Sequence, residues 1–229
     1  MSKSDAPLPA SLVIFDCDGV LVDSEPLSMR VLLETVAEAG TVINPEQGYE
    51  RFLGKSLASV TGILRRDYGI AVSDDALEKM RKRLYALFEK ELQPITGIAE
   101  ALTSIALPSC VASSSQIERV KLSLTVTGLA PFFGTRIFSA SMVEHGKPAP
   151  DLFFHAAREM HIEPARCIVI EDSPAGVEAA KRAGMRVFAF LGGSHAQSAA
   201  HRQSLEDLDP NLIFDDMAAL PGLIERVGQ

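Results

Sequence analysis

Short apolar runs alternate with helical patterns along most of the chain. Each run is followed by a segment whose apolar positions recur about every 3.6 residues, the spacing of a helix that buries one face. Short strands alternating with helices are typical of a parallel sheet covered on both sides. The pattern therefore predicts an α/β fold with a Rossmann-like, doubly wound and mainly parallel sheet. The expected strands are residues 12–15, 109–112, 136–139, 167–170, 186–190 and 212–214.

The alternation breaks between residues 24 and 92, where no convincing strand pattern intervenes. We interpret this stretch as an inserted helical domain, with linkers at 23–26 and 93–97 that contain the Pro or Gly expected of connecting segments. The prediction is a discontinuous α/β core domain of residues 1–23 and 93–229 and a helical domain of residues 24–92. Helical spacing within the insertion is clearest in residues 29–39, 57–68 and 74–91.

The composition fits a protein with a substantial core and an acidic surplus. With 229 residues, 47% of them hydrophobic, the chain has enough apolar material for one or two globular domains. A net charge of −8 at pH 7 disfavours a broad binding surface for nucleic acid or anionic lipid. A small anionic ligand would need a few local cations. No nucleic acid or membrane partner is expected, and the expected state is a monomer or weak homo-oligomer.

The cysteines and the apolar runs bear on the expected location. Cys17, Cys110 and Cys167 lie in or beside apolar runs without metal-binding spacing, which favours buried free thiols in a reducing compartment. Residues 1–10 lack the apolar core of a signal peptide, and no run approaches the roughly 18 apolar residues of a membrane span. The prediction is a cytoplasmic protein.

Two aspartates follow the first expected strand. Asp16 and Asp18 are separated by one residue, and Gly19 comes directly after them. Side chains two apart on a strand point the same way, and a turn at Gly19 frees the second carboxylate to swing over the first. That arrangement suits a nucleophile and a proton donor on either side of one reacting atom.

Polar residues follow three further strands of the expected sheet. Ser113 directly follows the expected strand at 109–112, and Lys147 lies in a Pro-containing loop after the next strand. Glu171 and Asp172 follow the strand at 167–170. Because the carboxyl ends of parallel strands meet at one edge of the sheet, these residues are expected to converge with the aspartate pair.

Two acidic pairs, a hydroxyl and a lysine suit a phosphate group and Mg²⁺. Mg²⁺ prefers oxygen ligands and is usually held by a few carboxylates, waters and substrate phosphate, which fits Asp16 and Asp172 with the backbone carbonyl of Asp18. Ser113 and Lys147 would hold the phosphoryl oxygens, the first by a hydrogen bond and the second by its charge.

These motifs, in this order, resemble those of the haloacid dehalogenase (HAD) superfamily over nearly the whole chain. The helical insertion after the first motif resembles the C1 cap of subfamily I. Such a cap is carried by phosphoglycolate phosphatase-like, β-phosphoglucomutase-like and 6-phosphogluconate phosphatase-like members. The resemblance implies hydrolysis of a small phosphomonoester, in particular a sugar phosphate or phosphorylated sugar acid, so the expected partner is a small phosphorylated metabolite. Caps of this kind exclude water and select substrates.

The resemblance also implies a role for each motif residue. Asp16 attacks phosphorus to form an aspartyl-phosphate, and Asp18 protonates the leaving oxygen and then activates water. Ser113 and Lys147 stabilise the transferred group. Dehalogenating members lack the second aspartate, so its presence here favours phosphate chemistry. The expected Mg²⁺ ligands are Asp16, Asp18, Asp172 and Glu171.

Further substrate contacts are expected from the cap and from the serine run. Residues 51–56 resemble the cap's specificity loop, in which Arg51, Gly54 and Lys55 are candidates for substrate binding. Ser114 is a candidate phosphate ligand beside Ser113. Residues 54–56 read like the end of a P-loop. Position 49 is Tyr rather than the Gly of that pattern, and no strand precedes the segment, which disfavours a Walker-type kinase.

Two alternatives to a phosphatase stay open, a phosphosugar mutase and a non-catalytic binding module on the same fold. Mutase members carry a cap-side histidine shortly after the first motif, and Ser28 occupies that place here, which favours net hydrolysis. A binding module would not require the complete catalytic set. No catalytic role is expected for the five histidines, His145, His155, His161, His195 and His201.

Overall fold

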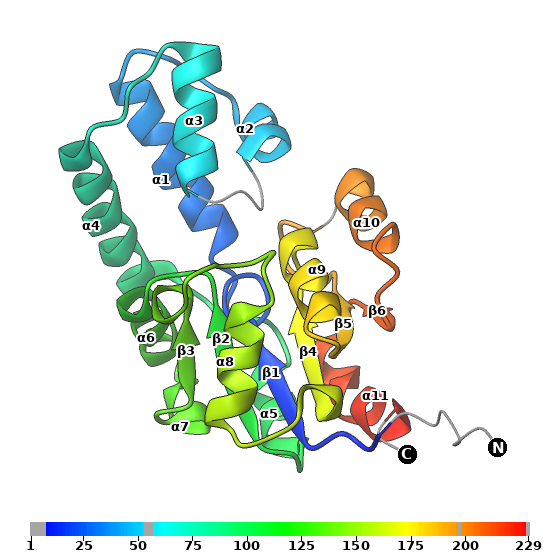
Figure 1. The fold of residues 1–229 in the computed structure, drawn as a ribbon. Helices are drawn as coiled ribbons and strands as arrows, with labels where there is room; N and C mark the ends of the chain where they lie inside the picture. Colours follow the sequence, from blue (N-terminus) through cyan, green and yellow to red (C-terminus); the bar gives the residue numbers. More distant parts are fainter. Residues whose placement is uncertain (1–7, 53–56, 197, 228–229) are drawn as a thin grey trace.

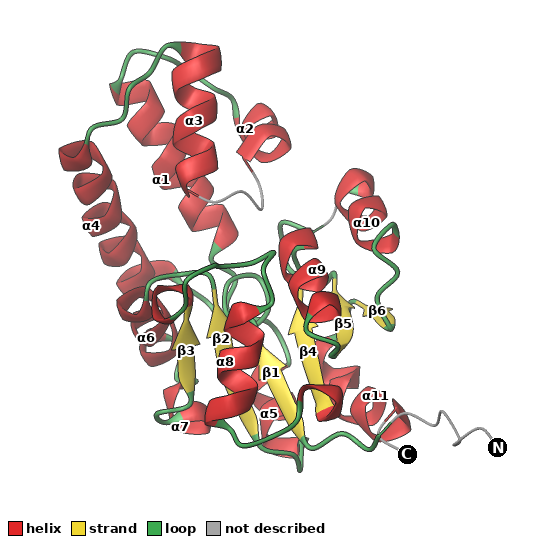
Figure 2. Cartoon of the chain, viewed as in Figure 1, coloured by secondary structure: helices red, strands yellow, loops and turns green. Residues whose placement is uncertain are grey.

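The computed structural model describes residues 8–52, 57–196 and 198–227. A six-stranded sheet lies at its centre, with every neighbouring pair of strands parallel and the order β3-β2-β1-β4-β5-β6 (Figures 1 and 2). The predicted Rossmann-like α/β fold is confirmed, and each strand begins and ends within one residue of its expected bounds. The strands are β1 (Leu12–Phe15), β2 (Ser109–Ser113), β3 (Ile137–Ser139), β4 (Cys167–Glu171), β5 (Arg186–Phe190) and β6 (Leu212–Phe214).

Helices cover both faces of the sheet, which is why its strands are apolar at successive positions. Along β1, Val13 and Phe15 join one buried cluster, and Leu12 and Ile14 join the other. The first cluster includes side chains of α5 (Ile98–Ser104), α6 (Ile117–Val126), α7 (Ala130–Phe133) and α11 (Leu220–Val227). The second includes side chains of α8 (Asp151–Glu159), α9 (Pro174–Arg182) and α10 (Ala199–Glu206).

Four of the five helices that the structure describes between β1 and β2 lie beyond the carboxyl ends of the strands (Figure 1). Met29, Phe52 and Leu64 belong to a third buried cluster formed among these helices, separate from the two on the sheet. No strand occurs in the described residues between 24 and 92, as the helical spacing predicts. The domain boundaries themselves stay a prediction. The helices are α1 (Glu25–Glu38), α2 (Pro45–Phe52), α3 (Leu57–Tyr68) and α4 (Asp74–Glu91).

The two linkers of the insertion run side by side. The backbone N–H of Asp23 donates to the carbonyl of Gln93 at 3.0 Å, and that of Ile95 donates to the carbonyl of Leu21 at 3.0 Å. The expected linker at 23–26 extends too far, because α1 already begins at Glu25. Pro26 fits the first turn of this helix, where a backbone N–H has no partner within the helix.

Two other expectations concern the interior and membranes. Cys17, Cys110 and Cys167 are all free and buried, as predicted. None of the helices in the described part of the chain combines the length and apolar character needed to cross a bilayer. The remaining elements are short 3₁₀ turns, η1 (Ala140–Met142), η2 (Pro164–Arg166) and η3 (Met217–Ala219).

Candidate active site

The first acidic loop leaves β1 and lies directly against the loop after β4. The backbone N–H of Asp16 donates to the carbonyl of Ile170 at 2.9 Å, which continues the pairing of the two strands by one residue. Gly19 has φ +79, and a Cβ atom there would lie 2.0 Å from Oδ2 of Asp172. Only glycine allows both this left-handed backbone and this close approach.

Lys147 joins three strand ends. Its ammonium donates to Oδ1 of Asp16 at 2.6 Å, to Oε1 of Glu171 at 2.6 Å and to the carbonyl of Ala112 at 2.9 Å. The side chain is only 3% exposed. Burial alone would lower the pKa of Lys147, but the Asp16 and Glu171 carboxylates outweigh burial and raise it. Lys147 is therefore charged, and its ammonium lies in direct contact with Asp16, the expected nucleophile.

Glu171 organises the start of α9. Its Oε2 accepts hydrogen bonds from the backbone N–H of Asp172 at 3.0 Å and from the N–H and hydroxyl of Ser173 at 3.0 and 2.9 Å. The Ser173 hydroxyl in turn accepts from the N–H of Gly176 and caps the helix, with Pro174 in its first turn. The carboxylate of Glu171 thus has a fixed position between Lys147 and the helix.

The carboxylate of Asp18 lies within a cluster of hydrogen-bond donors. Its Oδ1 accepts from the Ser24 hydroxyl at 2.5 Å and from Arg119 at 2.7 Å, and its Oδ2 accepts from the Ser115 hydroxyl at 2.6 Å. Burial raises the pKa of Asp18, but Arg119 and the two hydroxyls together lower it below its usual value. The second aspartate is a partly buried carboxylate with both oxygens hydrogen-bonded.

The serine run lies at the end of β2. Ser113 is buried, and its hydroxyl accepts from the backbone N–H of Ser115 at 3.1 Å. Ser139, at the end of β3, donates to the carbonyl of Ser115 at 2.6 Å and fixes the same turn. Ser113 and Ser114 both line the cavity described below, so the turn presents two hydroxyls beside the carboxylates.

Three carboxylates form a compact group that suits a cation. Asp16, Glu171 and Asp172 are buried, and they offer oxygens that all lie within 4.8 Å of one another. Burial raises the pKa of Asp16 well above its usual value, and the charges of Glu171, Asp172 and Asp18 raise it further, against the opposing effect of Lys147. The single positive charge of Lys147 does not neutralise three carboxylates. Their oxygens are the kind of ligand that Mg²⁺ prefers. The side chain of Asp18 lies outside the group.

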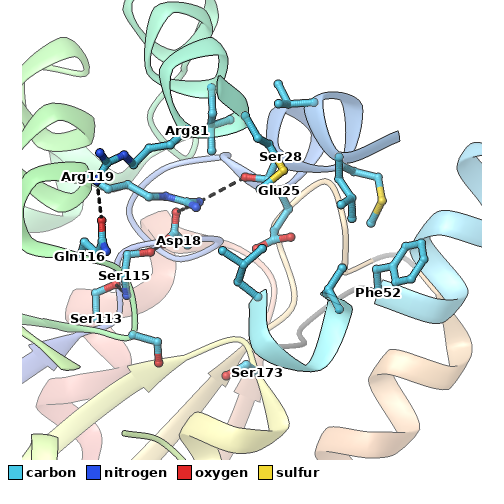
Figure 3. A pocket seen from close by; sticks show the side chains of 18 of the residues that line it. Asp18, Glu25, Ser28, Phe52, Arg81, Ser113, Ser115, Gln116, Arg119 and Ser173 are labelled. Carbon is cyan, nitrogen blue, oxygen red and sulfur yellow. Dashed lines mark hydrogen bonds and ion pairs between the residues drawn. The ribbon is translucent and has the colours of Figure 1, made fainter. Parts of the chain in front are cut away.

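A cavity of about 690 Å³ opens above these groups toward the helical insertion. Figure 3 shows Asp18, Ser113 and Ser115 with Arg81 of the insertion above them, and Phe52 of the insertion across the cavity. Arg51 is not among the lining residues, because its guanidinium forms an ion pair with Asp67 and packs on the Tyr68 ring. Its expected substrate contact finds no support here. Gly54 and Lys55 lie outside the described residues.

The family follows from comparison with known proteins. A model of the haloacid dehalogenase-like hydrolases matches residues 13–190, which include every motif residue listed above. The chain belongs to the haloacid dehalogenase-like hydrolases. The resemblance inferred from the sequence motifs is therefore confirmed.

Three relatives within the HAD-like hydrolases show how far the similarity extends. A 6-phosphogluconate phosphatase from Escherichia coli is 33% identical over 190 residues, which cover 82% of this chain and 86% of the relative. A haloacid dehalogenase-like protein of unknown function from Agrobacterium tumefaciens has a TM-score of 0.86 and 36% identity, covering 96% of this chain and all of that chain. A HAD family hydrolase from Deinococcus radiodurans, solved with bound phosphate and sodium, has a TM-score of 0.78 and 33% identity, covering 98% of each chain.

This HAD-like site includes residues that the sequence motifs did not identify. His195 is buried, and its Nε2 lies 2.7 Å from Oδ2 of Asp172. Burial lowers the pKa of His195, but Asp172 outweighs burial and raises it. No catalytic role is expected for His195 from the sequence, but the structure places it in the lining of the cavity beside Asp172. A signal was present, because His195 follows the carboxyl end of β5, where the strand-end rule also applies.

Glu25 is a further lining residue without an expected role. Burial raises its pKa from 4.5 to about 7, and the charge of Asp18 contributes. A carboxyl whose pKa is raised on folding contributes stability below its unfolded pKa and loses that contribution as the pH rises through its folded pKa. We therefore expect stability to fall between pH 5 and pH 8, as the protein ionises Glu25.

Replacing Glu25 by Gln tests this expectation. At pH 8, in chelator, the free energy of unfolding should rise by about 2 kcal/mol relative to wild type, a figure reduced for the partial exposure of the side chain. At pH 4 the two proteins should be equally stable. Urea unfolding at both pH values measures the difference. The control is Glu46→Gln, which removes an exposed carboxylate from the first turn of α2. An equal gain at both pH values would contradict the assignment.

Proposed function

We propose that the protein is a Mg²⁺-dependent phosphatase of the HAD-like hydrolases that acts on a small phosphomonoester through an aspartyl-phosphate. The observation that carries this proposal is the buried Lys147 ammonium held at 2.6 Å from Oδ1 of Asp16, with a second aspartate two residues away. A lysine charge beside a nucleophilic carboxylate stabilises the negative oxygens of a phosphoryl group during transfer. Asp18 supplies the proton that a poor leaving group needs.

The proposed reaction has two steps. An Asp16 oxygen attacks phosphorus, the bond from phosphorus to the leaving oxygen breaks, and Asp18 gives that oxygen its proton. In the second step Asp18 takes a proton from water, which attacks phosphorus and releases phosphate with Asp16 restored. Lys147 and Ser113 neutralise and orient the phosphoryl oxygens in both steps. Arg119 and the two serine hydroxyls together lower the pKa of Asp18 against burial, and a bound, negatively charged substrate phosphate would raise it, which favours the acid form when the first step needs it.

The carboxylate group is the proposed Mg²⁺ site. The buried oxygens of Asp16 and Asp172 are the proposed ligands together with the carbonyl of Asp18, and Glu171 stands beside them. When bound, Mg²⁺ neutralises phosphoryl charge and orients the phosphate for in-line attack. Glu171 already accepts four hydrogen bonds, from Lys147 and from the start of α9, which favours a supporting role over direct coordination.

The proposed substrates are sugar phosphates and phosphorylated sugar acids. A relative that is 33% identical over most of both chains is named a 6-phosphogluconate phosphatase. A cavity of about 690 Å³ has room for a metabolite of that size. The cytoplasmic location, the monomeric or weakly oligomeric state and the absence of a nucleic acid partner stay predictions from the sequence.

The position of Ser28 favours a phosphatase over a mutase. Ser28 lines the cavity, and its hydroxyl donates to the carbonyl of Ser24 at 3.0 Å and accepts from Arg119 at 3.2 Å. A mutase must return the phosphoryl group to its bound intermediate, and the resemblance places an assisting histidine at this position. Ser28 has a hydroxyl in place of the imidazole, and that hydroxyl is already hydrogen-bonded, so it does not provide the assistance that a histidine gives in a mutase.

Phosphate release from a substrate panel tests the proposal. The panel contains sugar phosphates, phosphorylated sugar acids, phosphoglycolate and nucleotides, each with Mg²⁺ and with chelator, and Asp16→Asn serves as the blank. We expect Mg²⁺-dependent release from one compound or a few related ones. Conversion of a sugar phosphate to its isomer without free phosphate would instead indicate a mutase. No reaction with any compound would indicate a binding role.

A further inference from the structure

Arg119 connects Asp18 to the helical insertion. It lies in the first turn of α6, and one of its terminal nitrogens donates to Oδ1 of Asp18 at 2.7 Å and to the Ser28 hydroxyl of α1 at 3.2 Å (Figure 3). Its guanidinium also lies 5.3 Å from the centre of the Phe88 ring on α4. One side chain of the core thus contacts the second aspartate and both helices that lead into and out of the insertion.

The surroundings of Arg119 hold the guanidinium in place. Its side chain is 21% exposed and that of Asp18 is 15% exposed, so water screens the ion pair weakly. Phe88 is itself buried and provides a flat surface against which a guanidinium stacks well. The Nε of Arg119 is buried with no hydrogen-bond partner among the described residues. An unpaired buried donor lowers stability, so the arrangement is not the one that stability alone would favour.

The chemistry of the donors distinguishes the two oxygens of Asp18. A guanidinium only donates hydrogen bonds, whereas a hydroxyl donates or accepts. Oδ1 faces Arg119, so it has to remain an acceptor. Oδ2 faces only the Ser115 hydroxyl among the described residues, and that hydroxyl can reverse its role when Oδ2 carries a proton. Oδ2 is therefore the oxygen free to exchange a proton.

From these contacts we propose that Arg119 is a positioning residue that fixes the acid–base group Asp18 by holding Oδ1 and leaving Oδ2 to transfer the proton. The inference rests on the proposed phosphatase function, because it concerns the residue that protonates the leaving oxygen. It assigns Arg119 no contact with the reacting phosphate. Loss of Arg119 should therefore lower kcat/KM most for substrates whose leaving oxygen most needs a proton.

Leaving-group dependence tests the inference. We would measure kcat/KM with Mg²⁺ for alkyl phosphates, phenyl phosphate, 4-nitrophenyl phosphate and 2,4-dinitrophenyl phosphate, because kcat/KM reports the steps up to leaving-group release. We expect Arg119→Met to lose on the order of 100-fold on alkyl phosphates and less than about 3-fold on the dinitrophenyl ester, whose leaving oxygen needs no proton. Arg119→Lys should recover part of the loss on alkyl phosphates, because it keeps a donor and a charge.

The controls separate positioning from folding. Lys121→Met removes an exposed cation from the same helix and should leave all four rates unchanged. Circular dichroism and thermal unfolding establish that each variant is folded, and Arg119→Lys provides the comparison if Arg119→Met is not. An equal loss on all substrates in folded protein would overturn the inference alone. A wild-type protein that releases phosphate neither from these esters nor from any compound of the substrate panel would overturn the proposed function and the inference with it.

Discussion

Asp16→Asn should abolish turnover, with kcat falling by at least on the order of 10⁴-fold, as expected when the nucleophile of a covalent mechanism is lost. An amide oxygen is a poor nucleophile, and no second group takes its place. Asp18 is hydrogen-bonded to Arg119, Ser24 and Ser115, and Glu171 is hydrogen-bonded to Lys147 and the start of α9. The measurement is phosphate release with Mg²⁺ on the substrate that the panel identifies.

The same variant should not lose stability in chelator. Burial and three neighbouring carboxylates raise the pKa of Asp16, so the ionised side chain opposes folding near neutral pH. The Asn variant removes that charge and keeps the shape of the side chain. We expect its free energy of unfolding at pH 8 to equal or exceed that of wild type, by urea titration. Loss of activity with intact folding is the result that the proposed role of Asp16 requires, and a folded variant with wild-type rates would contradict the proposal.

The sheet and the centre of the site could be predicted because both depend on short, local patterns. An apolar run that ends in a polar residue marks the carboxyl end of a buried strand, and parallel strands bring those ends together. Lys147 therefore contacts Asp16 although the two residues are 131 positions apart, and the local sequence around neither residue indicates the other as its partner. The pattern predicted the meeting place without specifying the hydrogen bonds there.

The contacts made from helix surfaces could not be predicted in the same way. Arg119 follows the serine run by a few residues, and an arginine on a helix is usually solvated, so only the fold shows that it reaches Asp18. Arg51 illustrates the opposite case, because this candidate for substrate contact forms an ion pair with Asp67 of α3 and is not among the residues that line the cavity. A long, flexible side chain has several partners within reach, and tertiary packing chooses among them. His195 differs, because its strand-end position was visible in the sequence.

Lys147→Met should be the most damaging substitution for stability and activity together. The variant leaves the buried carboxylates of Asp16 and Glu171 without the ammonium that now lies 2.6 Å from each. Removing one partner of a buried ion pair costs about 3 to 5 kcal/mol. Because the folded pKa of Asp16 is already raised, the loss should be small near pH 4 and grow as the pH rises and Asp16 ionises. Urea unfolding in chelator at pH 4 and pH 8 measures it.

Activity and stability should then respond differently to a second change. Adding Glu171→Gln to Lys147→Met removes one of the unpaired charges, so we expect the double variant to recover part of the lost stability. It should recover no activity, because the proposed role of Lys147 is to act on the transferring phosphoryl group, and kcat should stay about 10² to 10³-fold below wild type. Lys121→Met, an exposed lysine on α6, controls for the loss of one positive charge.

A Lys147→Met protein as stable as wild type at pH 8 would show that the carboxylates do not depend on this ammonium. If the double variant regained activity together with stability, Lys147 would have a structural role alone.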